Sequence, residues 1–134
     1  MIEFIGIPFI DKGRDYKGAD CYGLAKLYFK DILDIDIPDV MASPQQLKMA
    51  YLEYLSNINK FWIEHKEPKE NTIVAMRTDL NNPNLVTHFG IVIKVENRLK
   101  ILHTFRDVNS HLIDIDHPAY INKIVAYYEW KGNK

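Results

Sequence analysis

Apolar residues recur at helical spacing in the segment that follows Asp20. They fall at positions i, i+3, i+4, i+7 and i+11, which trace one stripe along a helix. Asp20 precedes the stripe and is a favoured N-cap type, so the pattern predicts a helix over residues 20–33 with Cys21 in its first turn. The residues of the stripe are Cys21, Leu24, Ala25, Tyr28 and Ile32.

A second helix is predicted by the run Ser-Pro-Gln-Gln at residues 43–46. Serine caps a helix, proline suits its first position, and the glutamine at the third position completes a capping box. We expect the apolar stripe that follows to pack on the core. The alternative is that its aromatic end borders a substrate groove. The stripe comprises Leu47, Ala50, Tyr51, Leu55, Ile58, Phe61 and Trp62.

From residue 72 onward, β-branched and aromatic residues come in short runs, which predict antiparallel strands at 72–76, 86–95, 99–105 and 123–130. Residues 96–98 are typical of a tight hairpin between the second and third strands. If its loop has two residues, His88 and His103 project from the same face, with His103 opposite Gly90 or Val92. A three-residue loop would put the histidines on opposite faces. We expect the two-residue loop.

The composition indicates one globular domain, which we expect to comprise residues 1–134. The chain is 47% apolar and 26% charged, as folded proteins are. Its formal net charge is -1, so no sequence-wide basic field favours nucleic acid, and no segment is apolar enough to span a membrane. The first ten residues include Glu3 and lack a cationic run, so we expect no secretory signal peptide.

Cys21 is the single cysteine, so it serves either packing or chemistry, because no internal disulfide can form. Its place at a helix start favours chemistry, since the first-turn N–H groups and the helix dipole lower the pKa of a thiol. A zinc site would have to rest on histidines and carboxylates. We expect no metal and no cofactor.

Nucleophilic catalysis needs a nucleophile, a base within hydrogen-bond reach, and a third group that orients the base. Cys21, His88 and His103 supply these groups in order along the chain. A single strand histidine is more often a packed side chain than a catalyst, but two on one face are less easily explained by packing. The remaining histidines lie in polar or proline-adjacent surroundings, and we expect them at the surface. They are His65, His111 and His117.

Three short motifs surround these residues. Residues 19–24 read Ala-Asp-Cys-Tyr-Gly-Leu and follow Pro8-Phe9 and several glycines. Residues 88–93 read His-Phe-Gly-Ile-Val-Ile, and residues 102–104 read Leu-His-Thr. In this order they resemble the nucleophile, base and orienting motifs of the NlpC/P60 family of cysteine peptidases. The likeness covers most of the chain, although each motif alone is short.

The resemblance implies a papain-like α+β fold, in which the cysteine-bearing helix and a second helix pack on an antiparallel sheet that presents the base. Family members typically hydrolyse amide bonds of peptidoglycan stem peptides, commonly the bond between D-γ-glutamyl and the following diamino acid. By the same resemblance, Cys21 attacks the carbonyl, His88 transfers the proton and His103 orients His88. The N–H of Cys21 is then the oxyanion donor, and Asp20 either binds the substrate amine or serves only as the helix cap.

Two positions depart from the family, because Phe9 stands where Tyr is usual and Tyr22 where Ser is usual. Tyr22 is then a candidate to contact substrate, and Tyr16 a candidate to supply the missing hydroxyl. The Tyr22 variant, the lack of a signal peptide or wall-binding module, and the helical insertion are similar to members found in phage tails and prophage-like elements. That likeness implies a hydrolase that is present in the bacterial cytoplasm before assembly, joins other tail proteins in the virion, and acts on the cell wall.

Two rival functions stay open. One is a structural tail-assembly protein that keeps the fold without activity, which the altered positions Phe9 and Tyr22 favour. The other is a papain-like amidase or acyltransferase acting on a lipid or another amide, because a Cys/His pair does not name the acyl group. Slow alkylation of Cys21 would favour the first rival. A wide apolar tunnel would favour the second.

Overall fold

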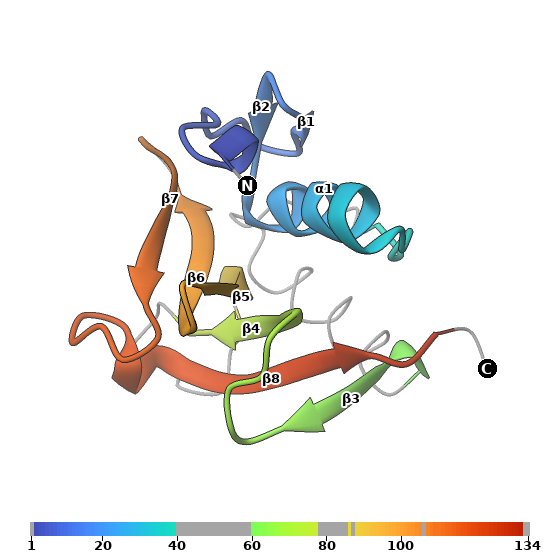
Figure 1. Cartoon of the computed structure of the whole chain (residues 1–134). Coiled ribbons are helices and arrows are strands. Elements are labelled where there is room, and N and C mark those ends of the chain that lie inside the picture. Colours follow the sequence, from blue (N-terminus) through green and yellow to red (C-terminus); the bar gives the residue numbers. More distant parts are fainter. Residues whose placement is uncertain (1, 40–59, 78–85, 87, 106, 133–134) are drawn as a thin grey trace.

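The computed structural model describes residues 2–39, 60–77, 86, 88–105 and 107–132, in which a helix packs on an antiparallel sheet (Figure 1). Helix α1 is Cys21–Leu33. The sheet has the order β3-β8-β4-β5-β6-β7, and every neighbouring pair of strands is antiparallel. Its strands are β3 (Trp62–His65), β4 (Thr72–Met76), β5 (His88–Val95), β6 (Arg98–Phe105), β7 (Val108–Asp114) and β8 (Ile124–Trp130).

Helix α1 begins where the sequence predicts, because Asp20 caps it. The Asp20 carboxylate accepts a hydrogen bond from the Gly23 N–H at 2.8 Å, which satisfies one of the free donors of the first turn. Gly23 is required for a close approach, since a Cβ there would lie 2.0 Å from the Gly13 carbonyl oxygen. The helix ends at Asp34, whose φ of 56° is left-handed and cannot continue it.

The core has two parts, one on each face of the sheet. On one face, Leu24 and Phe29 of α1 pack with Ile91 of β5 in the larger cluster. On the opposite face, Val92 and Ile101 belong to a smaller cluster. Consecutive strand residues point to opposite faces, so the alternation along β5 decides which side chains meet α1.

The hairpin between β5 and β6 confirms the expected two-residue loop. Glu96 and Asn97 both have left-handed backbone, with φ of 51° and 65°, as a type I′ turn requires. Val95 pairs with Arg98, and the register continues to Ile91 opposite Leu102. One further step places His103 opposite Gly90, so the two histidines share a face as predicted.

The structure also differs from the sequence prediction at several elements. Trp62 begins strand β3 and pairs with Trp130, whereas we expected it to end the second helix. Residues 43–59 of that predicted helix lie outside the described residues. Strand β7 was not predicted, and four short elements were also missed. These are η1 (Ile2–Phe4), β1 (Arg14–Asp15), β2 (Gly18–Ala19) and η2 (Ile121–Lys123).

The N-terminal segment is tied to β7 around Ser110. The Ser110 carbonyl accepts from the Gly6 N–H at 2.8 Å, and its hydroxyl accepts from the Ile7 N–H at 2.8 Å. The same hydroxyl donates to the Phe4 carbonyl at 2.6 Å, and Phe4 is fully buried. The segment before α1 therefore forms part of the core.

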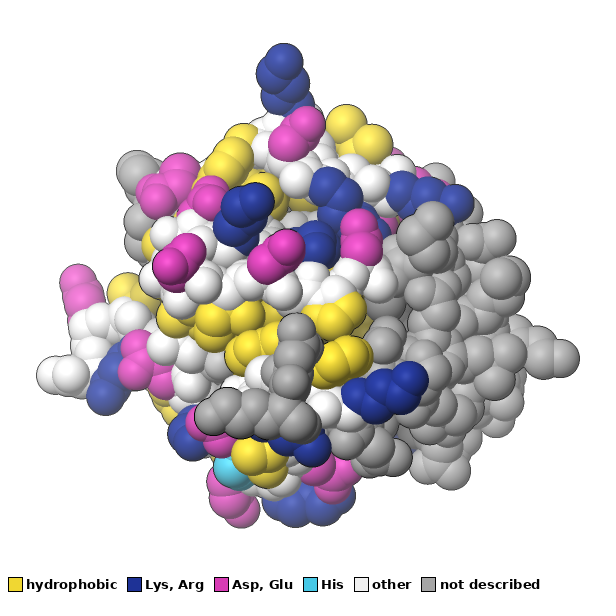
Figure 2. Space-filling model, turned by 90° about the vertical axis from the view of Figure 1, so that its right-hand side faces the viewer, with side chains coloured by type: hydrophobic (Ala, Val, Ile, Leu, Met, Phe, Trp, Pro, Cys, Tyr) yellow, Lys and Arg dark blue, Asp and Glu magenta, His cyan; other side chains and the backbone are white. Residues whose placement is uncertain are grey.

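Charged side chains of both signs are interspersed on the side of the molecule that carries the C-terminal end of α1, with hydrophobic side chains between them (Figure 2). No helix in the described part of the chain is long and apolar enough to cross a bilayer.

Candidate active site

Cys21 lies where the start of α1 meets the start of β5. It is 3% exposed. The backbone N–H groups of Tyr22 and Phe89 form hydrogen bonds to its thiol. Phe89 is the second residue of β5, so the thiol lies against the backbone of the residue that follows His88.

The electrostatic surroundings of Cys21 favour the neutral thiol. Burial and, after it, the negative charge of Asp20 raise the pKa of the Cys21 thiol to about 12. The two backbone N–H groups and the charge of Arg14 lower this pKa by less. We expected the helix start to lower the thiol pKa, but desolvation outweighs the favourable helix terminus in this state.

His88 and His103 are hydrogen-bonded to each other on one face of the sheet. The Nε2 atom of His88 lies 3.0 Å from Nδ1 of His103, and both rings are buried. Burial is the largest cause that lowers the pKa of His88 to about 4 and that of His103 to about 3. Both imidazoles are therefore neutral at neutral pH, as a base must be before it takes a proton.

The structure places the Cys21 thiol against the backbone of Phe89, the residue after His88, and shows no hydrogen bond between the thiol and the His88 ring among the described residues. His88 of β5 pairs with Met76 of β4, and both side chains point to the face of the sheet opposite α1. Cys21, in contrast, belongs to α1 itself. The described residues give Nδ1 of His88 no hydrogen-bond partner, so this is the ring nitrogen left for the thiol. Catalytic hydrogen bonds are often long in ligand-free sites and tighten with substrate.

His111 is half-buried and is bonded to His103, a contact that the sequence did not predict. Its Nε2 lies 3.1 Å from Nε2 of His103, and its Nδ1 lies 2.8 Å from the Asn109 carbonyl oxygen. It stands directly opposite His103 on β7, because the register of β6 and β7 shifts between His103 and Phe105. His65 bonds to Glu129 at the far edge of the sheet, and His117 packs on Tyr120.

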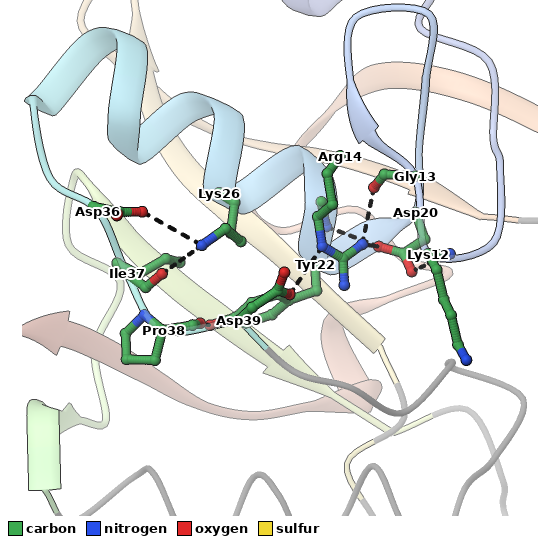
Figure 3. A network of polar contacts seen from close by, with 11 residues as sticks. Lys12, Gly13, Arg14, Asp20, Tyr22, Lys26, Asp36, Ile37, Pro38 and Asp39 are labelled. Atoms are coloured by element: carbon green, nitrogen blue, oxygen red, sulfur yellow. Dashed lines mark hydrogen bonds and ion pairs between the residues drawn. The ribbon is translucent and has the colours of Figure 1, made fainter.

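Asp20 is held by donors of the chain itself (Figure 3). Its Oδ1 accepts from Arg14 Nη1 at 2.8 Å and from the Gly23 N–H, and its Oδ2 accepts from the Lys12 N–H at 2.9 Å. Asp20 is almost fully buried. The helix-cap role is thus confirmed, while the contact with a substrate amine stays a prediction.

The two tyrosines of the predicted substrate site lie in different places. Tyr22 is buried, its hydroxyl donates to the Pro38 carbonyl (Figure 3), and its ring meets Phe89 edge-on at 5.8 Å. Tyr16 is 40% exposed, and its hydroxyl donates to Asp31. Asp31 follows Cys21 by ten residues along α1, which is about 15 Å of helix. The structure therefore places Tyr22 near the thiol and the Tyr16 hydroxyl toward the other end of α1.

A pocket of about 290 Å³ lies between the N-terminal segment and the turn that joins β6 to β7. The Pro8 carbonyl on one wall accepts from the Ala19 N–H at 3.0 Å, two residues before Cys21. The Asn109 carbonyl on the other wall accepts from His111. Carboxylates on both walls favour a cationic or amino group. The lining residues are Pro8, Phe9, Asp11, Asp107, Val108 and Asn109.

The described residues contain no group of three or more His, Cys, Asp or Glu side chains arranged to hold a metal ion.

Comparisons with known proteins identify the fold. No protein-family model and no curated protein matches the sequence. A solved lipoprotein-like NLP/P60 family structure from Staphylococcus aureus is similar with a TM-score of 0.63 and 16% identity, over 98% of this chain and 39% of that one. The NlpC/p60 domain of the peptidoglycan hydrolase SagA is similar with a TM-score of 0.60 and 14% identity, over 96% of this chain and 91% of that domain. The chain thus has the α+β fold of NlpC/P60 structures, as its motifs imply.

Proposed function

We propose that this chain is a cysteine peptidase that hydrolyses amide bonds of peptidoglycan stem peptides. The observation that carries the proposal is the placement of Cys21 against Phe89, one residue from His88, which is itself hydrogen-bonded to His103. The fold supports the substrate class, since one similar structure is a domain of a peptidoglycan hydrolase.

The first chemical step forms an acyl-enzyme. His88 takes the thiol proton at Nδ1 while the sulfur of Cys21 attacks the carbonyl carbon, and the carbonyl electron pair moves to oxygen. The Cys21 N–H belongs to the first helical residue and has no acceptor within the helix, so it suits the oxyanion. The oxyanion then collapses, the C–N bond breaks, and His88 gives its proton to the leaving amine.

The second step releases the acid. Water attacks the thioester carbonyl while His88 takes one of its protons, and the sulfur leaves with its electron pair and recovers a proton from His88. His103 holds the His88 ring in both steps through the 3.0 Å hydrogen bond. Because the thiol is neutral at rest, the thiolate forms only as the attack begins.

The finer assignment concerns the bond and the setting. We place the cut at the bond between D-γ-glutamyl and a diamino acid, since stem peptides carry free amino groups and the pocket beside the site presents Asp11 and Asp107. We assign the enzyme to a phage tail, where it opens the wall next to other tail proteins. This setting rests on the resemblance of residue Tyr22 and its neighbourhood to tail-associated members.

Mass spectrometry of fragments released from purified peptidoglycan, at several pH values, tests the proposal. The wild-type chain should release cleaved stem peptides, and Cys21→Ala should release none. His65→Phe serves as a control, because His65 lies on β3 at the opposite edge of the sheet from β7. If neither the wild type nor Cys21→Ala released stem peptides from walls of several chemotypes, the proposed peptidase activity would be refuted.

A structural tail protein is the second candidate. Cys21 is only 3% exposed, and Asp20, the predicted amine ligand, already forms an ion pair with Arg14. Both features suit a fold kept for assembly. The lipid-acyl alternative has less support, because the pocket beside the site carries carboxylates on its walls.

A further inference from the structure

We propose that His111 is a positioning residue, which acts through His103 to fix the hydrogen of His88 on Nε2 and so leaves Nδ1 free to accept the thiol proton. The catalytic meaning of this inference rests on the proposed peptidase function. Its structural basis is a row of three imidazoles joined by hydrogen bonds of 3.0 and 3.1 Å. The row ends on the backbone carbonyl of Asn109, 2.8 Å from His111.

The direction of the row follows from that carbonyl. A carbonyl oxygen accepts hydrogen bonds and cannot donate, so Nδ1 of His111 must carry a hydrogen. A neutral imidazole has one donor and one acceptor nitrogen, so Nε2 of neutral His111 accepts. The hydrogen bond to His103 therefore requires that Nε2 of His103 donates.

The tautomer of His103 in turn fixes the tautomer of His88. With its hydrogen on Nε2, neutral His103 accepts at Nδ1, and the 3.0 Å hydrogen bond requires Nε2 of His88 to donate. Neutral His88 then has its lone pair on Nδ1. A proton acceptor for Cys21 needs that tautomer, because a hydrogen on Nδ1 would block the transfer.

His103 cannot set this direction by itself. An imidazole between two partners can donate a hydrogen bond to either one and accept from the other. The direction is therefore fixed only if a group at one end of the row can only accept or only donate. The Asn109 carbonyl can only accept, and His111 transmits that direction. The register shift after His103 is what brings His111 opposite it, since the uninterrupted Phe105–Val108 register would pair His103 with Ser110.

Burial keeps the row well defined. His103 is fully buried, and its ring meets Tyr120 edge-on at 5.1 Å and Phe105 at 5.4 Å. Water is thus kept from the ring that joins the other two, and the low pKa values of His88 and His103 agree with neutral rings. A row of neutral rings with one fixed end has a single satisfied arrangement of hydrogens.

Nitrogen NMR of the histidine rings tests the arrangement directly on the wild-type protein at pH 8, where ordinary histidines are neutral. We expect hydrogens on Nε2 of His88, Nε2 of His103 and Nδ1 of His111. In His111→Phe the fixed end is lost, and His88 and His103 should populate both tautomers. A hydrogen on Nδ1 of His88 in the wild type, or unchanged tautomers in His111→Phe, would overturn the inference.

Kinetics on peptidoglycan supply the functional readout. His111→Phe should lower kcat by about 10- to 100-fold, by analogy with the partners that orient metal-bound histidines, with KM unchanged. His111→Gln should restore kcat to within about threefold, because its amide oxygen can accept from His103. His65→Phe, the same change at the other edge of the sheet, should leave kcat unchanged. Equal kcat in His111→Phe and wild type would refute the positioning role.

The two proposals fail in distinguishable ways. If the wild-type rings show the expected hydrogens while no variant or wild type cleaves peptidoglycan, the direction set by His111 stands and the peptidase falls. If the wild type cleaves and its rings show the opposite hydrogens, the peptidase stands and the role of His111 falls.

Discussion

The two sides of the candidate site hold ionisable groups in opposite ways. Beside α1, Asp20 is a buried carboxylate whose charge is held by Arg14 and two backbone N–H groups. On the other face of the sheet, buried His88 and His103 satisfy one another as neutral rings. The charged groups beside α1 stabilise the fold, whereas the neutral rings on the other face have a defined direction of hydrogen-bond donation.

Cys21 is affected by both sides. The charge of Asp20 raises the pKa of the thiol, whereas neutral His88 offers no positive charge that would lower it. The resting site is therefore a neutral thiol near a neutral base, and it differs from a preformed thiolate–imidazolium pair. The proposed peptidase activity would then require proton transfer during the attack, which makes the tautomer of His88 decisive.

Acid should produce the largest loss of stability, because it protonates the buried neutral histidines His88 and His103. Unfolded histidines bind protons below pH 6.5, whereas the pKa of folded His88 is about 4, so stability is retained above pH 6.5 and falls as the pH decreases toward 4. We expect a loss of about 2 kcal/mol between pH 7 and 5 from His88, with a comparable loss from His103. Urea unfolding at the two pH values measures it. His88→Phe should show a smaller loss, and an equal loss in that variant would contradict the assignment.

The regular elements could be predicted because their periodicity reflects one buried face. The stripe from Cys21 gives α1, and β-branched runs give four of the strands. The shared face of His88 and His103 follows from the two-residue loop at Glu96 and Asn97. Those features depend on local geometry, which is why the sequence carries them.

The features that were missed depend on contacts that the local sequence does not encode. Strand β7 is an edge strand with polar residues, so it lacks a strong strand pattern. The place of His111 depends on a register shift, which moves every later residue of the pairing by one. Arg14 reaches Asp20 only because Gly13 and Gly23 approach closely.

Removal of the Asp20 side chain should cause the next largest loss of stability, because it removes the carboxylate that binds Arg14 and two backbone N–H groups. Asp20→Ala removes the helix cap and a buried partner of Arg14, and we expect a loss of about 2 kcal/mol in the free energy of unfolding. Urea unfolding at pH 7 measures it. Asp36→Ala is a matched control, since Asp36 is 80% exposed and its ion pair with Lys26 should contribute almost nothing. Equal losses in both variants would contradict the role of the network.

A charge change without loss of the cap sharpens the comparison. Asp20→Asn keeps a good N-cap residue but removes the negative charge that raises the pKa of the Cys21 thiol. Alkylation of Cys21 by iodoacetamide at pH 8 should therefore become about two- to tenfold faster, since a lower pKa increases the thiolate fraction. An unchanged rate would show that Asp20 does not affect the thiol.

Slow alkylation of Cys21 in the wild type does not indicate a structural protein, although we expected it to favour that function. Burial is the first cause of the raised pKa of Cys21, so both an active peptidase and a structural protein should react slowly at rest. Alkylation of the wild type alone cannot separate the two functions. Release of stem peptides, with Cys21→Ala as its control, can.

The smallest effect is expected at Tyr16, which lies outside both sides of the comparison. Its hydroxyl bonds to exposed Asp31 near the end of α1, so Tyr16→Phe should change the free energy of unfolding by less than about 0.5 kcal/mol and leave kcat unchanged. Tyr22→Phe is the informative partner, because the Tyr22 hydroxyl bonds to the Pro38 carbonyl and its ring packs on Phe89 beside the thiol. Urea unfolding and peptidoglycan release, measured on both variants, test the contrast. A tenfold loss of kcat in Tyr16→Phe would mean that this hydroxyl moves to the site when substrate binds, since in the present structure it bonds to Asp31 and not to a residue near Cys21.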